Sequence, residues 1–197
     1  METPYRKALG HSTWDKVYAR QALRADLLQE WMEALRITPG ARVLDVGAGP
    51  GYMSLALADR VGPTGIVYAV DRSADALAYL ERLQRERGIM HIRRIIADLT
   101  TVPLGDLSPD LGLITMMLHH TDDPGAILTG VARLLPSGAR AIVAEFHPDG
   151  PGQVGPPLSE RIAPDQVRCW CAEAGLEVLT YRRQTPEHYM LLVQRRP

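Results

Sequence analysis

Short apolar runs alternate with longer amphipathic stretches along most of the chain. The short runs are rich in Val, Ile and Leu, and each leads into a stretch with apolar residues at helical spacing, which is typical of βαβ units and a parallel sheet. Five strands are expected at residues 42–46, 66–70, 92–97, 111–118 and 140–145, and helices at 52–61, 74–87, 124–135 and from 164 onward. The pattern therefore predicts an α/β fold.

The two ends of the chain depart from this alternation. Residues 12–35 predict one or two amphipathic helices, and residues 176–183 and 188–194 predict an antiparallel pair. We expect a doubly wound, seven-stranded, mostly parallel, Rossmann-like sheet that finishes in an antiparallel hairpin. The prediction is one domain over residues 1–197, with residues 1–38 as a helical cover and residues 39–197 as the core.

The segment VLDVGAGPGY, residues 43–52, joins the first strand to the next helix. Its alternate glycines allow a tight turn and a close ligand approach, and they bring backbone N–H groups and a helix N-terminus to the carboxyl edge of the sheet. The dinucleotide fingerprint requires glycine or alanine at its sixth position, where this chain has Tyr52. Asp45, two positions before the first glycine, suits a cationic ligand, directly or through water. The loop therefore favours an amino-acid-bearing nucleoside over a dinucleotide.

Two further carboxylates follow the next two strands. Asp71 ends the second strand, where a carboxylate can accept both hydrogen bonds of a ribose diol. Asp98 ends the third strand, where it can accept from an adenine amino group while apolar neighbours enclose the ring. Both side chains are candidates for binding a nucleoside.

Residues 43–55, 68–73, 96–99, 110–124 and 134–145 resemble, in order and spacing, the successive motifs of class I S-adenosylmethionine-dependent methyltransferases. The resemblance covers roughly residues 12–195 and is to the broad group that includes the ubiquinone and menaquinone biosynthesis C-methyltransferases. It implies S-adenosyl-L-methionine as cofactor, S-adenosyl-L-homocysteine as product and methyl transfer to a small-molecule acceptor, possibly aromatic or quinone-like. The residues expected at the cofactor are Asp45, Gly47, Ala48, Gly49, Gly51, Asp71, Arg72, Asp98, Leu99, Thr115 and Met116.

Methyl transfer depends mainly on alignment of donor and acceptor, so no universal catalytic residue is required. If a general base assists, His119 and His120 are candidates at the end of the fourth strand, where alternation would turn only one of them toward the site. Glu145 and His147 are candidates where the fifth strand ends. The proline- and glycine-rich residues 147–157 predict a loop that covers the acceptor.

Composition narrows the function further. A net charge of −1 gives no general attraction for nucleic acid. No apolar run approaches the roughly 20 residues that span a bilayer, and no signal segment is evident, so we expect a cytoplasmic protein. Cys169 and Cys171, two apart in a predicted helix, can neither bridge nor form a zinc site alone, and no metal is expected. Two alternatives stay open, a nicotinamide-dependent oxidoreductase and an S-adenosylmethionine-binding protein without transferase activity.

Overall fold

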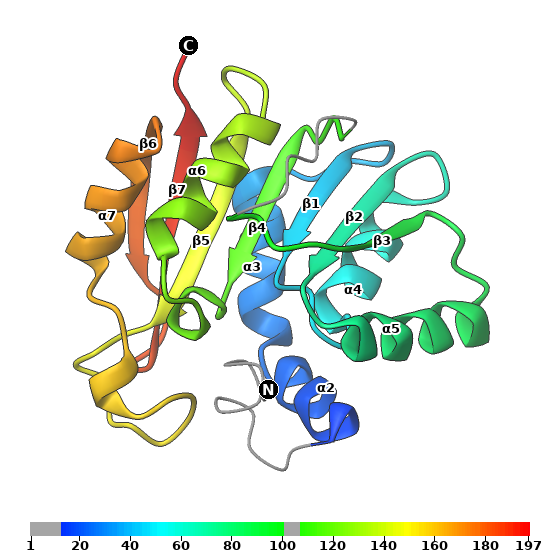
Figure 1. Cartoon of the computed structure of the whole chain (residues 1–197), viewed down its shortest axis with the longest axis horizontal. Helices are drawn as coiled ribbons and strands as arrows, with labels where there is room; N and C mark the ends of the chain where they lie inside the picture. The colour runs from blue at the N-terminus through cyan, green and yellow to red at the C-terminus, as the bar shows by residue number, and fades with distance from the viewer. Residues whose placement is uncertain (1–12, 101–106) are drawn as a thin grey trace.

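Seven strands form one sheet in the order β3-β2-β1-β4-β5-β7-β6 in the computed structural model, which describes residues 13–100 and 107–197 (Figure 1). β1 to β5 pair in parallel, while β7 is antiparallel to both β5 and β6. The strands are β1 (Arg42–Val46), β2 (Ile66–Asp71), β3 (Ile92–Ile96), β4 (Leu111–Thr115), β5 (Arg140–Phe146), β6 (Leu176–Arg183) and β7 (His188–Arg195). The predicted seven-stranded sheet with its antiparallel hairpin is confirmed.

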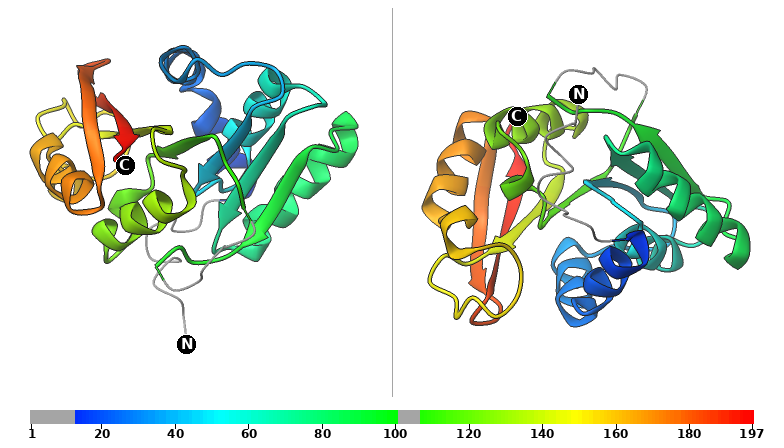
Figure 2. Two further views of the ribbon diagram at one scale, coloured as in Figure 1. Left: turned by 90° about the horizontal axis from the view of Figure 1, so that it is seen from above. Right: turned by 60° about the horizontal axis from the view of Figure 1, so that its bottom comes forward.

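Helices cover both faces of the sheet (Figures 1 and 2). They are α2 (Trp14–Ala22), α3 (Ala25–Leu35), α4 (Tyr52–Val61), α5 (Ala74–Arg87), α6 (Pro124–Leu134) and α7 (Pro164–Glu173), with short 3₁₀ turns η1 (Leu118–His120) and η2 (Leu158–Glu160). Residue 12, where the N-terminal helical stretch was expected to begin, lies outside the described residues.

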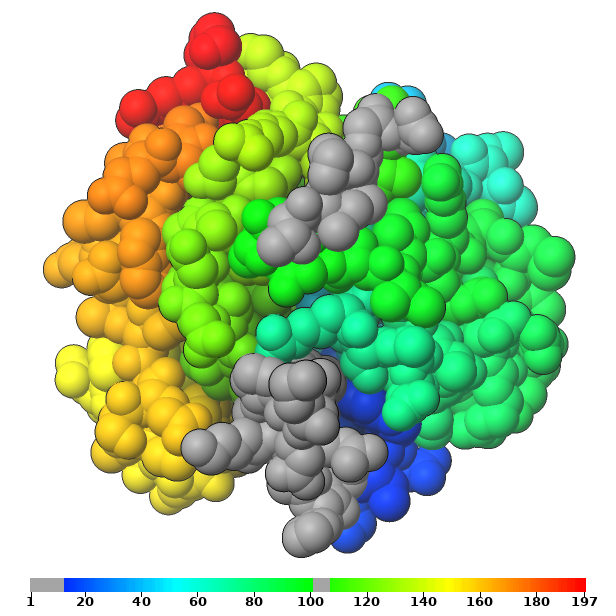
Figure 3. Space-filling model, in the orientation of Figure 1, coloured from blue at the N-terminus to red at the C-terminus, as the bar shows by residue number. Residues whose placement is uncertain are grey.

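Alternation along the strands divides the apolar interior into two layers. Val43 of β1 packs with α3, α4 and α5, whereas its neighbour Leu44 packs with α6 and α7 on the opposite face. Figure 3 shows α6 and α7 side by side on the face in view. Because the central strands β1, β2, β4 and β5 are buried on both sides, they read in the sequence as continuous apolar runs, whereas the edge strands β3 and β6 keep exposed positions.

Local signals explain where the helices begin and end. Ser73 precedes α5 and its Oγ accepts from the N–H of Ala76 at 3.2 Å, while Gly88 ends the helix in the left-handed region with φ 66°. Asp123 precedes α6, and its carboxylate accepts from the N–H of Ala126 at 2.8 Å.

β4 is shorter than the sequence predicted. The apolar run 111–118 was expected to be one strand, but the strand ends at Thr115 and Met116 has a left-handed backbone with φ 52°. Leu118 then starts η1, because its N–H donates at 2.8 Å to the carboxylate of Glu145 on the neighbouring strand. The expectation that only one of His119 and His120 faces the site is therefore wrong, since both lie on a turn and both line the cavity described below.

Within residues 13–100 and 107–197, no helix is long and apolar enough to cross a membrane. The same residues contain no group of three or more His, Cys, Asp or Glu side chains placed to hold a metal ion. Both cysteines are free thiols, as their spacing indicated; Cys171 is buried, whereas Cys169 is exposed.

Candidate active site

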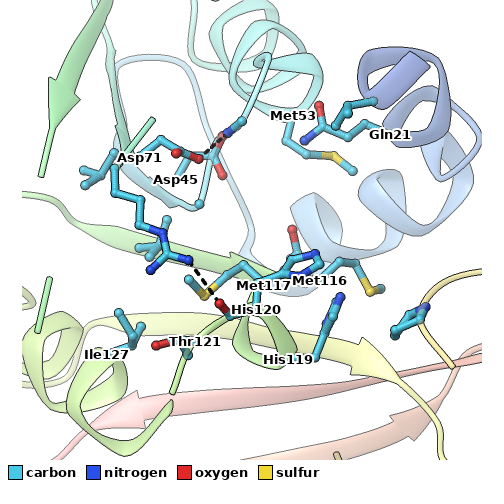
Figure 4. A pocket seen from close by; sticks show the side chains of 18 of the residues that line it. Gln21, Asp45, Met53, Asp71, Met116, Met117, His119, His120, Thr121 and Ile127 are labelled. Atoms are coloured by element: carbon cyan, nitrogen blue, oxygen red, sulfur yellow. Dashed lines mark hydrogen bonds between the residues drawn. The ribbon is translucent and has the colours of Figure 1, made fainter. Parts of the chain in front are cut away.

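A cavity of about 310 Å³ lies at the carboxyl ends of the parallel strands. Its lining crosses the sheet in strand order, from Asp98 after β3, through Asp71 of β2 and Gly47 after β1, to Met116 after β4 and Phe146 of β5. Figure 4 shows Gln21 of α2 facing this edge from the other side. Open α/β sheets bind ligands in this position.

The glycine loop forms part of the cavity through two of its glycines. Gly47 and Gly49 both have positive φ, 72° and 56°, and both line the cavity. A Cβ on Gly47 would collide with the side chain of Met117. Gly51 instead packs against Leu80, so it serves the turn rather than the cavity wall. The loop therefore exposes its backbone at two places where a side chain would interfere.

Asp71 is held in place by the backbone around it. One carboxylate oxygen accepts from the N–H of Gly49 and the other from the N–H of Ser73, both at 2.8 Å. Burial raises the pKa of Asp71, and these two hydrogen bonds oppose the rise. A carboxylate has about four acceptor positions, so Asp71 keeps free lone pairs for a diol. Its position is the one predicted for a ribose ligand.

Asp45 lines the same cavity, although its side chain is only 2% exposed. It accepts a hydrogen bond of 2.5 Å from the hydroxyl of Ser54 in α4. Burial raises the pKa of Asp45 to about 7, the Ser54 bond opposes this shift, and the nearby charge of Asp71 adds to it. A cationic ligand group beside Asp45 would favour its charged form.

The other residues predicted at the cofactor also gather here. Of the whole predicted set, only Ala48 and Gly51 do not line the cavity. Arg72 spans it, with Nη2 donating to the carbonyl of His120 at 3.2 Å. Asp98 accepts from the N–H and hydroxyl of Thr100 through one carboxylate oxygen.

His119 and Glu145 form a dyad where the cavity meets the ends of β4 and β5. His119 Nδ1 lies 2.7 Å from Glu145 Oε2, and Glu145 is fully buried. Burial alone would raise the pKa of Glu145, but His119 and the N–H groups of Phe146 and Leu118 hold it below its ordinary value. The ionised carboxylate can only accept, so the Nδ1–H of His119 donates to it and Nε2 is left for a ligand.

The other two candidate histidines, His120 and His147, differ from His119 in their surroundings. His120 lines the cavity with its ring centroid 4.0 Å from that of His119, and burial lowers its pKa to about 4, which keeps it neutral. Its Nδ1 is buried without a hydrogen-bond partner in the described residues. His147 is not in the cavity, because its Nδ1 accepts from the N–H of Asp149 and its ring packs edge-on to Tyr189. Glu145 likewise does not line the cavity; it lies behind the wall and contacts the lining residues His119 and Phe146.

The loop after β5 supplies part of the cavity wall. Gly155, Pro156 and Pro157 line it. The guanidinium of Arg161 fixes the loop by donating to the carbonyls of His147, Val154 and Pro156 and to the carboxylate of Glu187. The predicted loop is thus present and is tied to the β6–β7 turn.

Sequence reasoning missed the residues that close the cavity from the N-terminal side. Gln21 Nε2 donates to the carbonyl of Ala48 at 3.3 Å, and its Oε1 accepts from the N–H of Tyr52 at 3.2 Å, so it braces the glycine loop. Arg20 and Arg24 line the cavity beside it. The sequence carries no specific signal for them, because Arg20 and Gln21 lie at the end of α2 whereas Arg24 lies in the short link before α3.

Sequence comparisons find methyltransferases among the relatives of this chain. The chain is 28% identical over 117 residues to the demethylmenaquinone methyltransferase of Anoxybacillus flavithermus, covering 59% of this chain and 49% of that protein, so it spans about half the length of that relative. It is 26% identical over 212 residues to the ubiquinone biosynthesis O-methyltransferase of Pseudomonas aeruginosa, covering 94% of this chain and 88% of that protein.

A solved structure supports the fold. A SAM-dependent methyltransferase from Aquifex aeolicus superposes with a TM-score of 0.80 at 21% identity, covering 92% of this chain and 98% of that chain. The methyltransferase domain family matches residues 37–192, which is most of the chain. With the glycine loop, Asp71 and the 3-2-1-4-5-7-6 sheet already in place, the chain belongs to the methyltransferase domain family, in its class I, S-adenosylmethionine-dependent form.

Proposed function

We propose that the protein transfers a methyl group from S-adenosylmethionine to a small-molecule acceptor bound in the same cavity. The observation that carries this proposal is that one cavity joins the glycine loop and Asp71 to His119 and Phe146. The glycine loop and Asp71 suit a nucleoside, whereas His119 offers a base and Phe146 an aromatic surface. Holding donor and acceptor side by side supplies most of what methyl transfer needs.

The residues present fit the cofactor that the family implies. Asp71 is positioned to accept from a ribose diol, the backbone at Gly47 and Gly49 is open to a close approach, and Asp45 suits an ammonium group. When bound, S-adenosylmethionine supplies an electrophilic sulfonium methyl group. The protein's contribution on this side is to bind, orient and shield the donor.

On the acceptor side, His119 is the residue that handles a proton. Its Nδ1–H is engaged by Glu145, so Nε2 accepts the proton of an acceptor hydroxyl, activated carbon or amine as the methyl group is transferred. Glu145 keeps the imidazole in this tautomer and stabilises the imidazolium that forms. His120, neutral and beside it, adds no competing charge.

The acceptor is aromatic or quinone-like in this proposal. Met116, Met117, Ile127 and Phe146 give the cavity apolar surfaces. The two named relatives are a demethylmenaquinone methyltransferase and a ubiquinone biosynthesis O-methyltransferase, which favours acceptors of this shape.

Calorimetric titration with S-adenosylhomocysteine and, separately, with NAD tests the donor. We expect binding of the first and none of the second, and the reverse result would support a nicotinamide-dependent oxidoreductase. A screen for transfer of a radiolabelled methyl group to catechols, hydroquinones and naphthols tests the reaction. Binding of S-adenosylhomocysteine without transfer to any of them would support a binding protein without transferase activity.

A further inference from the structure

We propose that the acceptor carries a carboxylate and that Arg24 binds it. This inference rests on the proposed function and names a chemical class for its acceptor. The guanidinium of Arg24 lines the cavity and lies over the ring of Phe146, 5.2 Å from its centroid. Within the described part of the chain, this guanidinium makes no hydrogen bond and no ion pair, so its donors are available to a ligand.

The surroundings of Arg24 disfavour its positive charge when no anion is bound beside it. Burial lowers the pKa of Arg24 to about 10; Glu145 opposes the shift and Arg20, which also lines the cavity, adds to it. The Arg24 side chain is half-buried, and a charge removed from water to this extent is normally paired and hydrogen-bonded. Arg24 and the more exposed Arg20 both line the cavity, and in the described part of the chain neither makes an ion pair, so an anionic ligand is the favourable occupant of the space before them.

The carboxylates of the chain do not meet this need. Glu145 raises the pKa of Arg24 but is committed to His119 and to the N–H groups of Leu118 and Phe146. Glu160 lines the same cavity, yet the described residues show no ion pair between it and Arg24. The planar fork of an arginine matches a carboxylate through two parallel hydrogen bonds, which favours this anion over others.

The position of Arg24 assigns it to the acceptor rather than to the cofactor. Gln21, at the end of α2, reaches the glycine loop at Ala48 and Tyr52. The chain leaves the helix after Ala22, and Arg24, with φ −106° and ψ 21°, directs its side chain to Phe146 at the end of β5. β4 lies between β5 and the β1 strand that carries the glycine loop. Arg24 therefore faces the part of the cavity that also contains His119.

Matched acids and amides test this proposal in protein saturated with S-adenosylhomocysteine. The probes are 4-hydroxybenzoate, 3,4-dihydroxybenzoate, salicylate and phenylacetate, each compared with its primary amide by calorimetry or ligand-observed NMR. We expect the wild type to prefer at least one acid over its amide by about tenfold or more, as for a charge-assisted hydrogen bond. Arg24→Gln should abolish that preference, Arg24→Lys should retain part of it, and Arg93→Gln, an exposed arginine on β3, should leave it unchanged.

A second comparison separates the acceptor's carboxylate from the cofactor's own. If Arg24 binds the acceptor, Arg24→Gln keeps its affinity for S-adenosylhomocysteine within about threefold of wild type. If that affinity falls while the affinity for 5′-methylthioadenosine, which lacks the carboxylate, is unchanged, Arg24 binds the cofactor and the proposal is wrong. Absence of any acid preference in wild-type protein that binds S-adenosylhomocysteine also overturns it, without affecting the proposed donor. Melting temperatures establish that each variant is folded.

Discussion

The Nδ1 of His119 lies 2.7 Å from the Oε2 of Glu145. His119 is on the turn that follows β4 and Glu145 is near the end of the adjacent strand β5, 26 residues later in the chain. The same carboxylate accepts from the N–H groups of Leu118 and Phe146. Glu145 thus both starts the 3₁₀ turn that carries the histidine and fixes the orientation of its ring. The buried carboxylate of Glu145 therefore holds both the backbone of the turn that lines the cavity and the tautomer of His119.

We expect Glu145→Gln to lower kcat about tenfold and His119→Asn to lower it about 100-fold, within the range for loss of a general base. Both variants should bind S-adenosylhomocysteine with near wild-type affinity, because the donor side is untouched. Steady-state kinetics with an acceptor from the methyl-transfer screen measures both. The double variant should be no slower than His119→Asn, since the two residues act as a unit.

Glu177→Gln, on an exposed part of β6, is the matched control for that pair. Full activity of a folded His119→Asn variant would remove the histidine from the reaction. Additive losses in the double variant would show that Glu145 acts independently of His119.

Asp71→Ala should weaken binding of S-adenosylhomocysteine by about 10- to 150-fold, because the ribose hydroxyls lose a charged acceptor worth roughly 1.5–3 kcal/mol. Part of that loss comes from the N–H of Gly49, which also loses its acceptor. Asp71→Asn keeps the side-chain volume and one acceptor oxygen, so it should fall between the wild type and the alanine variant. Calorimetry measures all three.

The control for Asp71 is Asp75→Asn in the exposed first turn of α5. Unchanged affinity in a folded Asp71→Ala variant would place the nucleoside elsewhere in the cavity.

Local sequence patterns predicted the features that depend on local interactions. The strands, the glycine loop and Asp71 follow from apolar periodicity and from a turn that only glycine allows. The end of β4 could not be predicted in this way, because Leu118 donates to a carboxylate 27 residues away. An uninterrupted apolar run contains no signal for a contact of that kind.

The acceptor side of the cavity depends even more on long-range packing. Arg24 lies in a stretch that the sequence predicted to be helical, and the Phe146 ring under its guanidinium ends β5, far along the chain. His119 and Glu145 were both candidates, but only the structure shows that one orients the other. Local periodicity places strands and helices, whereas the pairing of side chains from different strands requires the fold.

Asp45→Asn should stabilise the free protein and weaken the donor site. The pKa of Asp45 is about 7 in the folded chain and near 3.8 when unfolded. Between pH 4 and 7 the folded state therefore binds a proton that the unfolded state lacks, so this group makes stability fall as pH rises through that window. At pH 8 the variant should gain at least about 3 °C in Tm, or roughly 1 kcal/mol, and near pH 4 almost nothing.

The affinity for S-adenosylhomocysteine should show the complementary trend. An ammonium group favours ionised Asp45, so wild-type affinity should rise from pH 6 to pH 8, and Asp45→Asn should lose this dependence. Asp59→Asn, exposed on α4, is the control. A variant that is no more stable than wild type at pH 8 would show that Asp45 is not a strained buried acid.

The ion pair between Arg161 and Glu187, with Nη1 and Oε2 2.5 Å apart, should be what keeps the acceptor wall in shape. Arg161→Gln removes the donor for three loop carbonyls and for Glu187, so we expect Tm to fall by several degrees. Glu187→Gln, which keeps an acceptor for the N–H of Gln153, should lower Tm less. Both should raise the KM for the acceptor about fivefold or more, because Gly155 to Pro157 lose their fixed position.

Binding of S-adenosylhomocysteine should stay within about threefold of wild type in both variants, since the wall lies beside β5 rather than the glycine loop. Calorimetry and acceptor titrations at saturating S-adenosylmethionine separate the two effects, with Glu177→Gln again as control. If the affinity for S-adenosylhomocysteine fell as much as the affinity for the acceptor, the loop would also support the donor site. A loop that contacts only the acceptor has no direct way to weaken binding of the nucleoside.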